Sequence, residues 1–186
     1  MLVALMTTLV LVGLGCGIEG STAVAGADHR LDTGKTTMEN FDLNLKLERS
    51  EPEPEQEKGV WIRVTLQNGG RQPAWVNKRL AWNGPNVPKP FREVWFRVQD
   101  ADKNELPFLC KIKIRFPEAG DYLSLPAGES VSKNIRLSSC YDLKSGASYL
   151  VKAFYQDGNA EPPEPAHGAV YVKNVIESGA LEVKGE

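Results

Sequence analysis

Alternation of hydrophobic and polar positions dominates the chain from about residue 41 onward. Residues 41–47 place one phenylalanine and three leucines at every second position, and residues 60–66 place four aliphatic side chains in the same way. This period of two is typical of β-strands with one buried face and one wet face. Similar patterns predict further strands at residues 74–80, 92–98, 108–116, 131–137, 148–156, 169–175 and 181–183.

Turn-forming residues separate these predicted strands. Asn68-Gly69-Gly70 ends the second strand, and residues 83–90 form a loop with three prolines. Prolines and glutamates exclude regular structure at residues 51–57. Because no long window after residue 40 has a helical period, we expect an all-β antiparallel sandwich.

Three stretches carry a resemblance to a known family. Residues 64–70, Val-Thr-Leu-Gln-Asn-Gly-Gly, resemble the strand and turn of bacterial immunoglobulin-like domains. Residues 122–131 are similar to the following turn of these domains, and residues 141–151 to the next strand entry. The same series occurs in the sandwich before the catalytic domain of some secreted deuterolysin-like metallopeptidases. The resemblance implies an immunoglobulin-like sandwich of about seven to nine strands. It does not imply peptidase activity, because the HExxH motif is missing.

The N-terminal segment is apolar and carries no charge through residue 18. Such a run predicts a secretory signal or a short membrane anchor. Gly13-Leu14-Gly15-Cys16 resembles a bacterial lipobox, which implies cleavage before Cys16 and its lipidation. The match departs from the usual lipobox in having Gly13 instead of leucine, and no basic residue precedes the apolar run.

Two other fates of this segment stay open. Signal-peptidase cleavage after Ala25 or Ala27 would release a secreted protein, and an uncleaved segment would act as an anchor. All three fates place the remainder outside the cytoplasm. We therefore expect a signal peptide with lipobox at residues 1–16, a flexible tether at residues 17–39 and one sandwich domain at residues 40–186.

The cysteine count agrees with export. If Cys16 is lipidated or removed, Cys110 and Cys140 are left. An even pair in an oxidising compartment predicts a disulfide. Two separate buried thiols are the alternative.

Composition and motifs argue against several classes of function but do not identify one. The formal net charge is −2, which gives no electrostatic basis for nucleic-acid binding. The chain has no recognisable catalytic motif, and its two histidines, His29 and His167, stand in polar stretches. The stretch from Asp100 imitates a calcium loop but has Glu105 where glycine is required, which favours a hairpin turn. We expect no enzyme activity, no cofactor and no metal.

A repeated tryptophan and arginine spacing is the most informative candidate site. Trp61 and Arg63, and likewise Trp95 and Arg97, stand opposite the aliphatic rows of their strands. If the two strands are neighbours, these four side chains form an aromatic and cationic patch. Either the patch stabilises the sheet or is covered by the N-terminal tether, or it contacts a partner.

These observations predict a non-catalytic binding or scaffolding module outside the cytoplasm. Its expected partners are a bacterial membrane, through the N-terminal lipid anchor, and an unknown envelope or secreted protein. The alternative is an inhibitor of, or accessory to, an extracytoplasmic peptidase, by fold-level analogy only. The proline-stiffened loop at residues 83–90 would then be the wedge that enters the protease cleft.

Overall fold

The computed structural model describes residues 42–52, 57–88, 91–157, 164 and 174–186. These residues form strands joined by turns, loops and two short 3-10 turns, η2 (Ala119–Asp121) and η3 (Leu137–Ser139). The strands are β1 (Leu43–Arg49), β2 (Trp61–Asn68), β3 (Ala74–Asn77), β4 (Val94–Gln99), β5 (Tyr122–Leu125), β6 (Ser130–Arg136), β7 (Ser148–Tyr155), β8 (Ile176–Glu177) and β9 (Leu181–Lys184).

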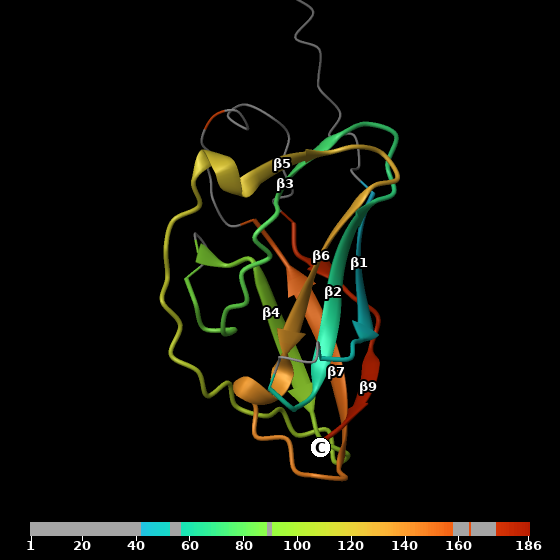
Figure 1. Cartoon of the computed structure of the whole chain (residues 1–186), viewed down its shortest axis with the longest axis vertical. Helices are drawn as coiled ribbons and strands as arrows, with labels where there is room; N and C mark the ends of the chain where they lie inside the picture. Colours follow the sequence, from blue (N-terminus) through green and yellow to red (C-terminus); the bar gives the residue numbers. More distant parts are fainter. Residues whose placement is uncertain (1–41, 53–56, 89–90, 158–163, 165–173) are drawn as a thin grey trace, which may run out of the picture. The chain divides into compact units, whose positions relative to one another are not determined.

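The strands make two main antiparallel sheets. One sheet has the order β1-β2-β6, and in the other β7 pairs with β4 on one edge and with β8 and β9 on the other. A small third sheet pairs β3 with β5. The sheet of β1, β2 and β6 lies across that of β4, β7 and β9 as two layers (Figure 1). The expected all-β antiparallel sandwich is confirmed.

The core forms where the inner faces of the two layers meet. Ile62, Val64 and Leu66 of β2 are fully buried, which confirms the aliphatic row expected there. On the opposite layer, Phe96 of β4 lies beside Ala153 of β7 in register, and both are buried. Alternating positions in each strand therefore supply one shared hydrophobic core.

Buried polar groups tie loops to this core. The hydroxyl of fully buried Tyr155 accepts the main-chain N–H of Asn77 at 3.1 Å. Tyr141 donates its hydroxyl to the carbonyl oxygen of Phe96 at 3.0 Å. The side-chain amide of Asn68 donates to the carbonyl oxygen of Leu125 at 2.9 Å, so it joins the end of β2 to the end of β5.

Several predicted strands differ from the observed ones. The strand expected at 108–116 is wrong, because these residues pair with no other strand among those described. The strand expected at 74–80 ends at Asn77, since the chain turns there and Leu80 has a φ of 43°. Strand β5 was not expected. Most of the stretch expected at 169–175 lies outside the described residues, and β8 begins after it.

Candidate functional site

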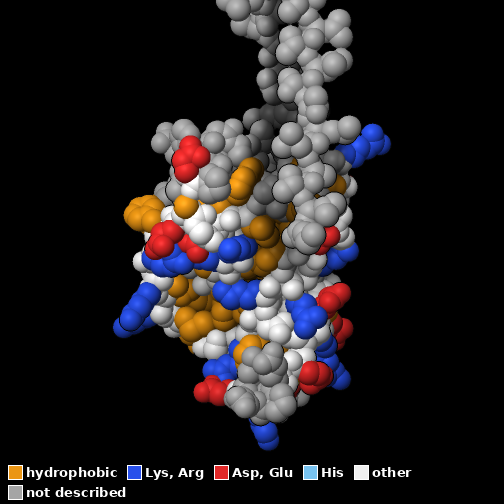
Figure 2. All heavy atoms as spheres, turned by 45° about the horizontal axis from the view of Figure 1, so that its top comes forward, with side chains coloured by type: hydrophobic (Ala, Val, Ile, Leu, Met, Phe, Trp, Pro, Cys, Tyr) orange, Lys and Arg blue, Asp and Glu red, His pale blue; other side chains and the backbone are white. Residues whose placement is uncertain are grey.

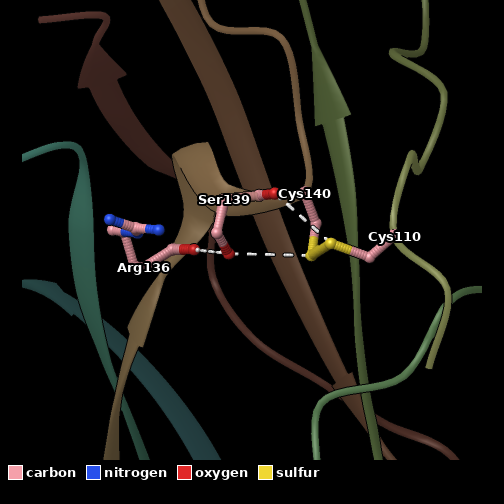
Figure 3. The surroundings of a disulfide bond; sticks show 4 residues. All are labelled: Cys110, Arg136, Ser139 and Cys140. Atoms are coloured by element: carbon pink, nitrogen blue, oxygen red, sulfur yellow. Dashed lines mark hydrogen bonds between the residues drawn. A yellow bond between two sulfur atoms is a disulfide. The ribbon is translucent and has the colours of Figure 1, made fainter. Parts of the chain in front are cut away.

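A disulfide joins Cys110 to Cys140, as the sequence predicts, with 5.0 Å between the Cα atoms. Figure 3 shows this bond beside η3. Ser139 donates its hydroxyl to the carbonyl oxygen of Arg136 at 2.7 Å, which helps to fix the turn that carries Cys140. The bond therefore attaches the long segment around Cys110 to the end of β6.

Residues 109–116 form an extended segment, called the 109–116 segment below, which lies outside the sheets (Figure 1). Leu109 donates its main-chain N–H to the carbonyl oxygen of Cys140 at 2.9 Å. Beyond that bond, the main-chain groups of residues 110–115 form no hydrogen bond with any described residue. No residue of the segment has a positive φ. The segment runs as an extended stretch (Figure 1), and none of the described strands pairs with it.

The 109–116 segment also exposes hydrophobic side chains. Leu109, Ile114 and Phe116 are 60%, 46% and 64% exposed. Lys111 and Lys113 lie between them in sequence, are exposed, and form no ion pair with a described residue. Hydrophobic side chains lie beside lysine and arginine side chains along the left of Figure 2, the side on which Figure 1 draws this segment.

A chain of ion pairs fixes the far end of the segment. Arg115 contacts both carboxylate oxygens of Asp121, at 2.9 Å each. Asp121 also lies 3.6 Å from Arg79, which in turn forms an ion pair with Glu93. Glu93 is nearly fully buried, and its second carboxylate oxygen accepts the N–H of Ala81 at 2.8 Å. The four charges therefore hold the segment, the turn after β3 and the start of β4 together.

The pKa shifts of these groups reflect burial and charge. Burial raises the pKa of the Asp121 carboxyl. Hydrogen bonds from Arg115 and the Glu118 N–H, together with the charge of Arg79, lower this pKa by more, so the net shift is downward. Burial lowers the pKa of Lys133, and the nearby charge of Arg79 lowers it more. Lys133 donates its ammonium group to the carbonyl oxygen of Arg79 at 3.0 Å. Lys133 and Arg79 therefore lie close together at this turn, where Glu93 and Asp121 balance the charge of Arg79.

A small cavity lies where this turn meets the 109–116 segment. Its volume is about 180 Å³, and the residues that line it are Arg79, Ala81, Asn83, Phe91, Lys113, Ile114 and Arg115. Its charged lining residues are cationic, but Arg79 and Arg115 are already paired with Glu93 and Asp121, so Lys113 is the lining cation without an ion-pair partner among the described residues. The cavity is therefore suited to an anionic group carried on a chain that can also contact apolar walls.

The expected patch of two tryptophans and two arginines does not form as one surface. Strands β2 and β4 belong to different sheets, so the condition that they are neighbours is wrong. On β2, Trp61 donates its indole N–H to the carbonyl oxygen of Glu57 at 3.0 Å. Arg63 donates to the side-chain oxygen of Asn134, on the neighbouring strand β6, at 3.1 Å.

On β4, the other half of the expected patch packs against its own sheet. Trp95 stacks on Phe154 of β7 with ring centroids 5.4 Å apart, and Trp95 is only 9% exposed. The guanidinium groups of Arg92 and Arg97 lie over Trp95 and Phe154, at 5.0 Å and 5.5 Å from the ring centroids. Trp95 therefore contributes mainly to packing, and a partner contact by Trp61, Arg63 and Arg97 stays a prediction.

The side chain of Arg92 holds the described part of the proline-rich loop in place by hydrogen bonds. Arg92 donates to the carbonyl oxygens of Pro85 and Val87, each at 2.9 Å from one guanidinium nitrogen. Residues 89 and 90 of the loop lie outside the described residues. The predicted turn after Asp100 is present, since Asp100 accepts the main-chain N–H of Asn104 at 2.8 Å.

Other residues singled out from sequence lie outside the described residues. They are Cys16, Ala25, Ala27, His29 and His167. Among the described residues, no helix has the length and hydrophobicity needed to cross a bilayer.

Sequence reasoning did not single out Arg79, Glu93 or Asp121. The four residues of the chain of ion pairs come from separate parts of the sequence, so no local sequence motif could have identified them. The chain matches no family model, and no curated protein matches it either.

Proposed function

We propose that the chain is a non-catalytic binding or scaffolding module that works outside the cytoplasm. The observation that carries this proposal is the disulfide between Cys110 and Cys140. Disulfides persist in oxidising compartments and are rare in the cytosol. The apolar N-terminal segment supports export independently, because it has the pattern of a secretory signal.

The proposed mode of retention is a lipid on Cys16, as in bacterial lipoproteins. The alternative is a secreted protein cut after Ala25 or Ala27. The antiparallel sandwich is compatible with the resemblance to the immunoglobulin-like domain of deuterolysin-like peptidases, and membership of that group of domains remains part of the proposal.

The 109–116 segment supports binding as the activity. Leu109, Ile114 and Phe116 present apolar surface next to cationic side chains. Exposed apolar groups in such a setting are typical of surfaces that contact another molecule. The partner in this proposal is an envelope or secreted protein.

Mass spectrometry of the mature N-terminus tests the proposed anchor. A diacylated Cys16 at the terminus is expected. An unmodified terminus at Gly26 or Asp28 contradicts the anchor but keeps export. A full-length chain in the cytosol with free thiols at Cys110 and Cys140 contradicts the proposed function as a whole.

Affinity capture from envelope extracts tests binding. The wild-type chain is expected to retain a defined partner that a Lys111→Glu/Lys113→Glu variant loses. A Trp61→Ala/Arg63→Ala variant examines the exposed half of the predicted tryptophan and arginine patch. If the wild type and both variants retain nothing beyond an unrelated lipoprotein control, the binding role is contradicted.

An inhibitor of, or accessory to, an extracytoplasmic peptidase is the second candidate function. The observation that favours it is the bracing of Pro85 and Val87 by Arg92, because a rigid loop loses little entropy on entering a cleft. Adding the purified chain to secreted peptidases should change their rates, and an Arg92→Gln variant should be less effective. Unchanged rates with the wild type count against this candidate.

A further inference from the structure

The 109–116 segment has three properties of an edge strand to which another strand can be added. Its main-chain donors and acceptors at residues 110–115 bond to no described residue. Its side chains alternate, with Lys111, Lys113 and Arg115 at one set of positions and apolar residues at the other. It lies outside the sheets (Figure 1). A second extended chain can pair with such a backbone by β-strand addition.

The segment is held in this shape before any partner arrives. The disulfide at Cys110 fixes one end, and the contact of Arg115 with Asp121 fixes the other. Phe116 packs on Phe91, with ring centroids 4.5 Å apart. Pre-organisation lowers the entropic cost of binding, because the receiving backbone does not need to be ordered on contact.

The charges indicate the chemistry of the added chain. Lys111 and Lys113 are exposed and form no ion pair with a described residue, and Lys113 also lines the neighbouring cavity. The other two cations of that lining, Arg79 and Arg115, are paired with Glu93 and Asp121. An anionic chain gains attraction from Lys111 and Lys113, whereas a cationic chain is repelled.

We propose that an extended acidic segment of a partner protein binds along residues 109–116 as an added strand. One of its carboxylate side chains pairs with Lys113 at the cavity that Lys113 lines. Its apolar side chains contact Ile114 and Phe116. This proposal rests on the proposed binding function and assigns that function a surface and a partner chemistry.

An anionic membrane surface is the other occupant that the charges suit. The backbone argues against it, because inserting Ile114 and Phe116 into lipid would carry unpaired main-chain groups toward a medium that offers them no partner. An added strand supplies those partners. The observations therefore favour the peptide, and the membrane becomes an outcome of the test.

The test uses the full chain in nanodiscs of zwitterionic lipid. The probe is a labelled, end-blocked peptide of about ten residues with alternating glutamate and valine, followed by fluorescence anisotropy. Binding is expected, and it should weaken by about tenfold or more in the Lys111→Glu/Lys113→Glu variant. The matched control is Lys46→Glu/Lys184→Glu, which makes the same charge change at exposed positions of β1 and β9 and should bind as the wild type does.

Two further peptides separate main-chain pairing from charge alone. A peptide with the same side chains but N-methylated at alternate residues should bind poorly, and a glutamine version should also bind poorly. Equal binding of the N-methylated peptide overturns strand addition. Failure of the glutamate peptide to bind, or equal loss in both double variants, overturns the proposal, as does binding to anionic nanodiscs without binding to the peptide. If the envelope capture survives Lys111→Glu/Lys113→Glu, this inference fails while the proposed function stands.

Discussion

Arg115 and Asp121 form a two-pronged ion pair in which each guanidinium nitrogen lies 2.9 Å from a different carboxylate oxygen. Asp121 also accepts the N–H of Glu118 at 2.8 Å and is only 13% exposed. The Asp121 carboxylate therefore does two things: it binds the planar guanidinium group of Arg115, and it caps the 3-10 turn η2.

Asp121→Asn should lower the free energy of unfolding by about 1–2 kcal/mol, because it weakens a charge-assisted network while keeping the shape of the side chain. The pKa of Asp121 is lowered in the folded protein, so its contribution is present above the ordinary pKa of 3.8 and is lost as the pH falls through the folded value. Urea unfolding should show the gap between wild type and variant closing below about pH 4.

The matched control for this prediction is Asp142→Asn. Asp142 forms an ion pair with Lys144, but both side chains are exposed, at 61% and 73%. Exposed pairs add little to stability, so this variant should unfold almost as the wild type does. A gap for Asp121→Asn that is unchanged at acid pH would contradict the role given to its charge.

Cys110→Ser/Cys140→Ser should lower stability by about 3.5 kcal/mol, because the bond closes a loop across a sequence separation of 30 residues and restricts the unfolded chain. Denaturant titration with and without a reductant measures this difference. The variant should be indifferent to the reductant, whereas the wild type should lose stability with it. Wild-type stability that is equal under both conditions would contradict the bond.

Tyr155→Phe should lower stability by about 1–2 kcal/mol, because the main-chain N–H of Asn77 loses its buried acceptor. Burial raises the pKa of Tyr155 above its ordinary value of 10.0. Its contribution is therefore complete below that pH and is lost as the pH rises, since the unfolded chain ionises first. Unfolding free energy should fall less steeply above about pH 10 in the variant than in the wild type.

Tyr141→Phe provides a second measurement of the same kind. Burial also raises the pKa of Tyr141, and its hydroxyl donates to Phe96. The free energy of unfolding of this variant should therefore also fall less steeply at alkaline pH than that of the wild type. A steeper decline in either phenylalanine variant would contradict the assignment of buried, protonated hydroxyls.

Trp95→Ala should lower stability by about 3 kcal/mol or more, because it removes a largely buried ring that stacks on Phe154. Trp61→Ala should cost less, since Trp61 is half-buried and its indole bonds to one carbonyl oxygen in a loop. Thermal unfolding of the two single variants gives the comparison. Equal losses would contradict the different roles assigned to the two tryptophans.

The sequence pattern predicted the faces of strands better than their neighbours. The row of Ile62, Val64 and Leu66 is buried as expected, because the side-chain period of a strand is set by its own backbone. The same period at residues 108–116 predicted a strand, but these residues pair with no strand in the part of the chain that the structure describes. Alternation reports an extended backbone, but the partner depends on distant segments. Pairing therefore could not be read from that stretch alone.

The candidate site shows the same limit. Trp61 and Trp95 have identical spacing to their arginines, yet they lie in different sheets, because spacing does not say which layer a strand joins. The disulfide was predictable, since after Cys16 is set aside only two cysteines are left to pair. The pairing of Arg79 with Glu93 was not, because a buried ion pair depends on how two loops meet in space.

The register between β2 and β6 has a consequence for the order of assembly. Trp61 lies opposite Arg136, whereas β1 and β2 pair as consecutive strands. A chain that emerges from its N-terminal end can close the first hairpin early, but one edge of β2 stays open until β6 has followed. Pairing between segments this far apart in sequence slows folding. Until β6 arrives, the open edge of β2 is prone to pair with another chain. A chaperone that covers this edge of β2 until β6 is made should therefore raise the yield of folded protein.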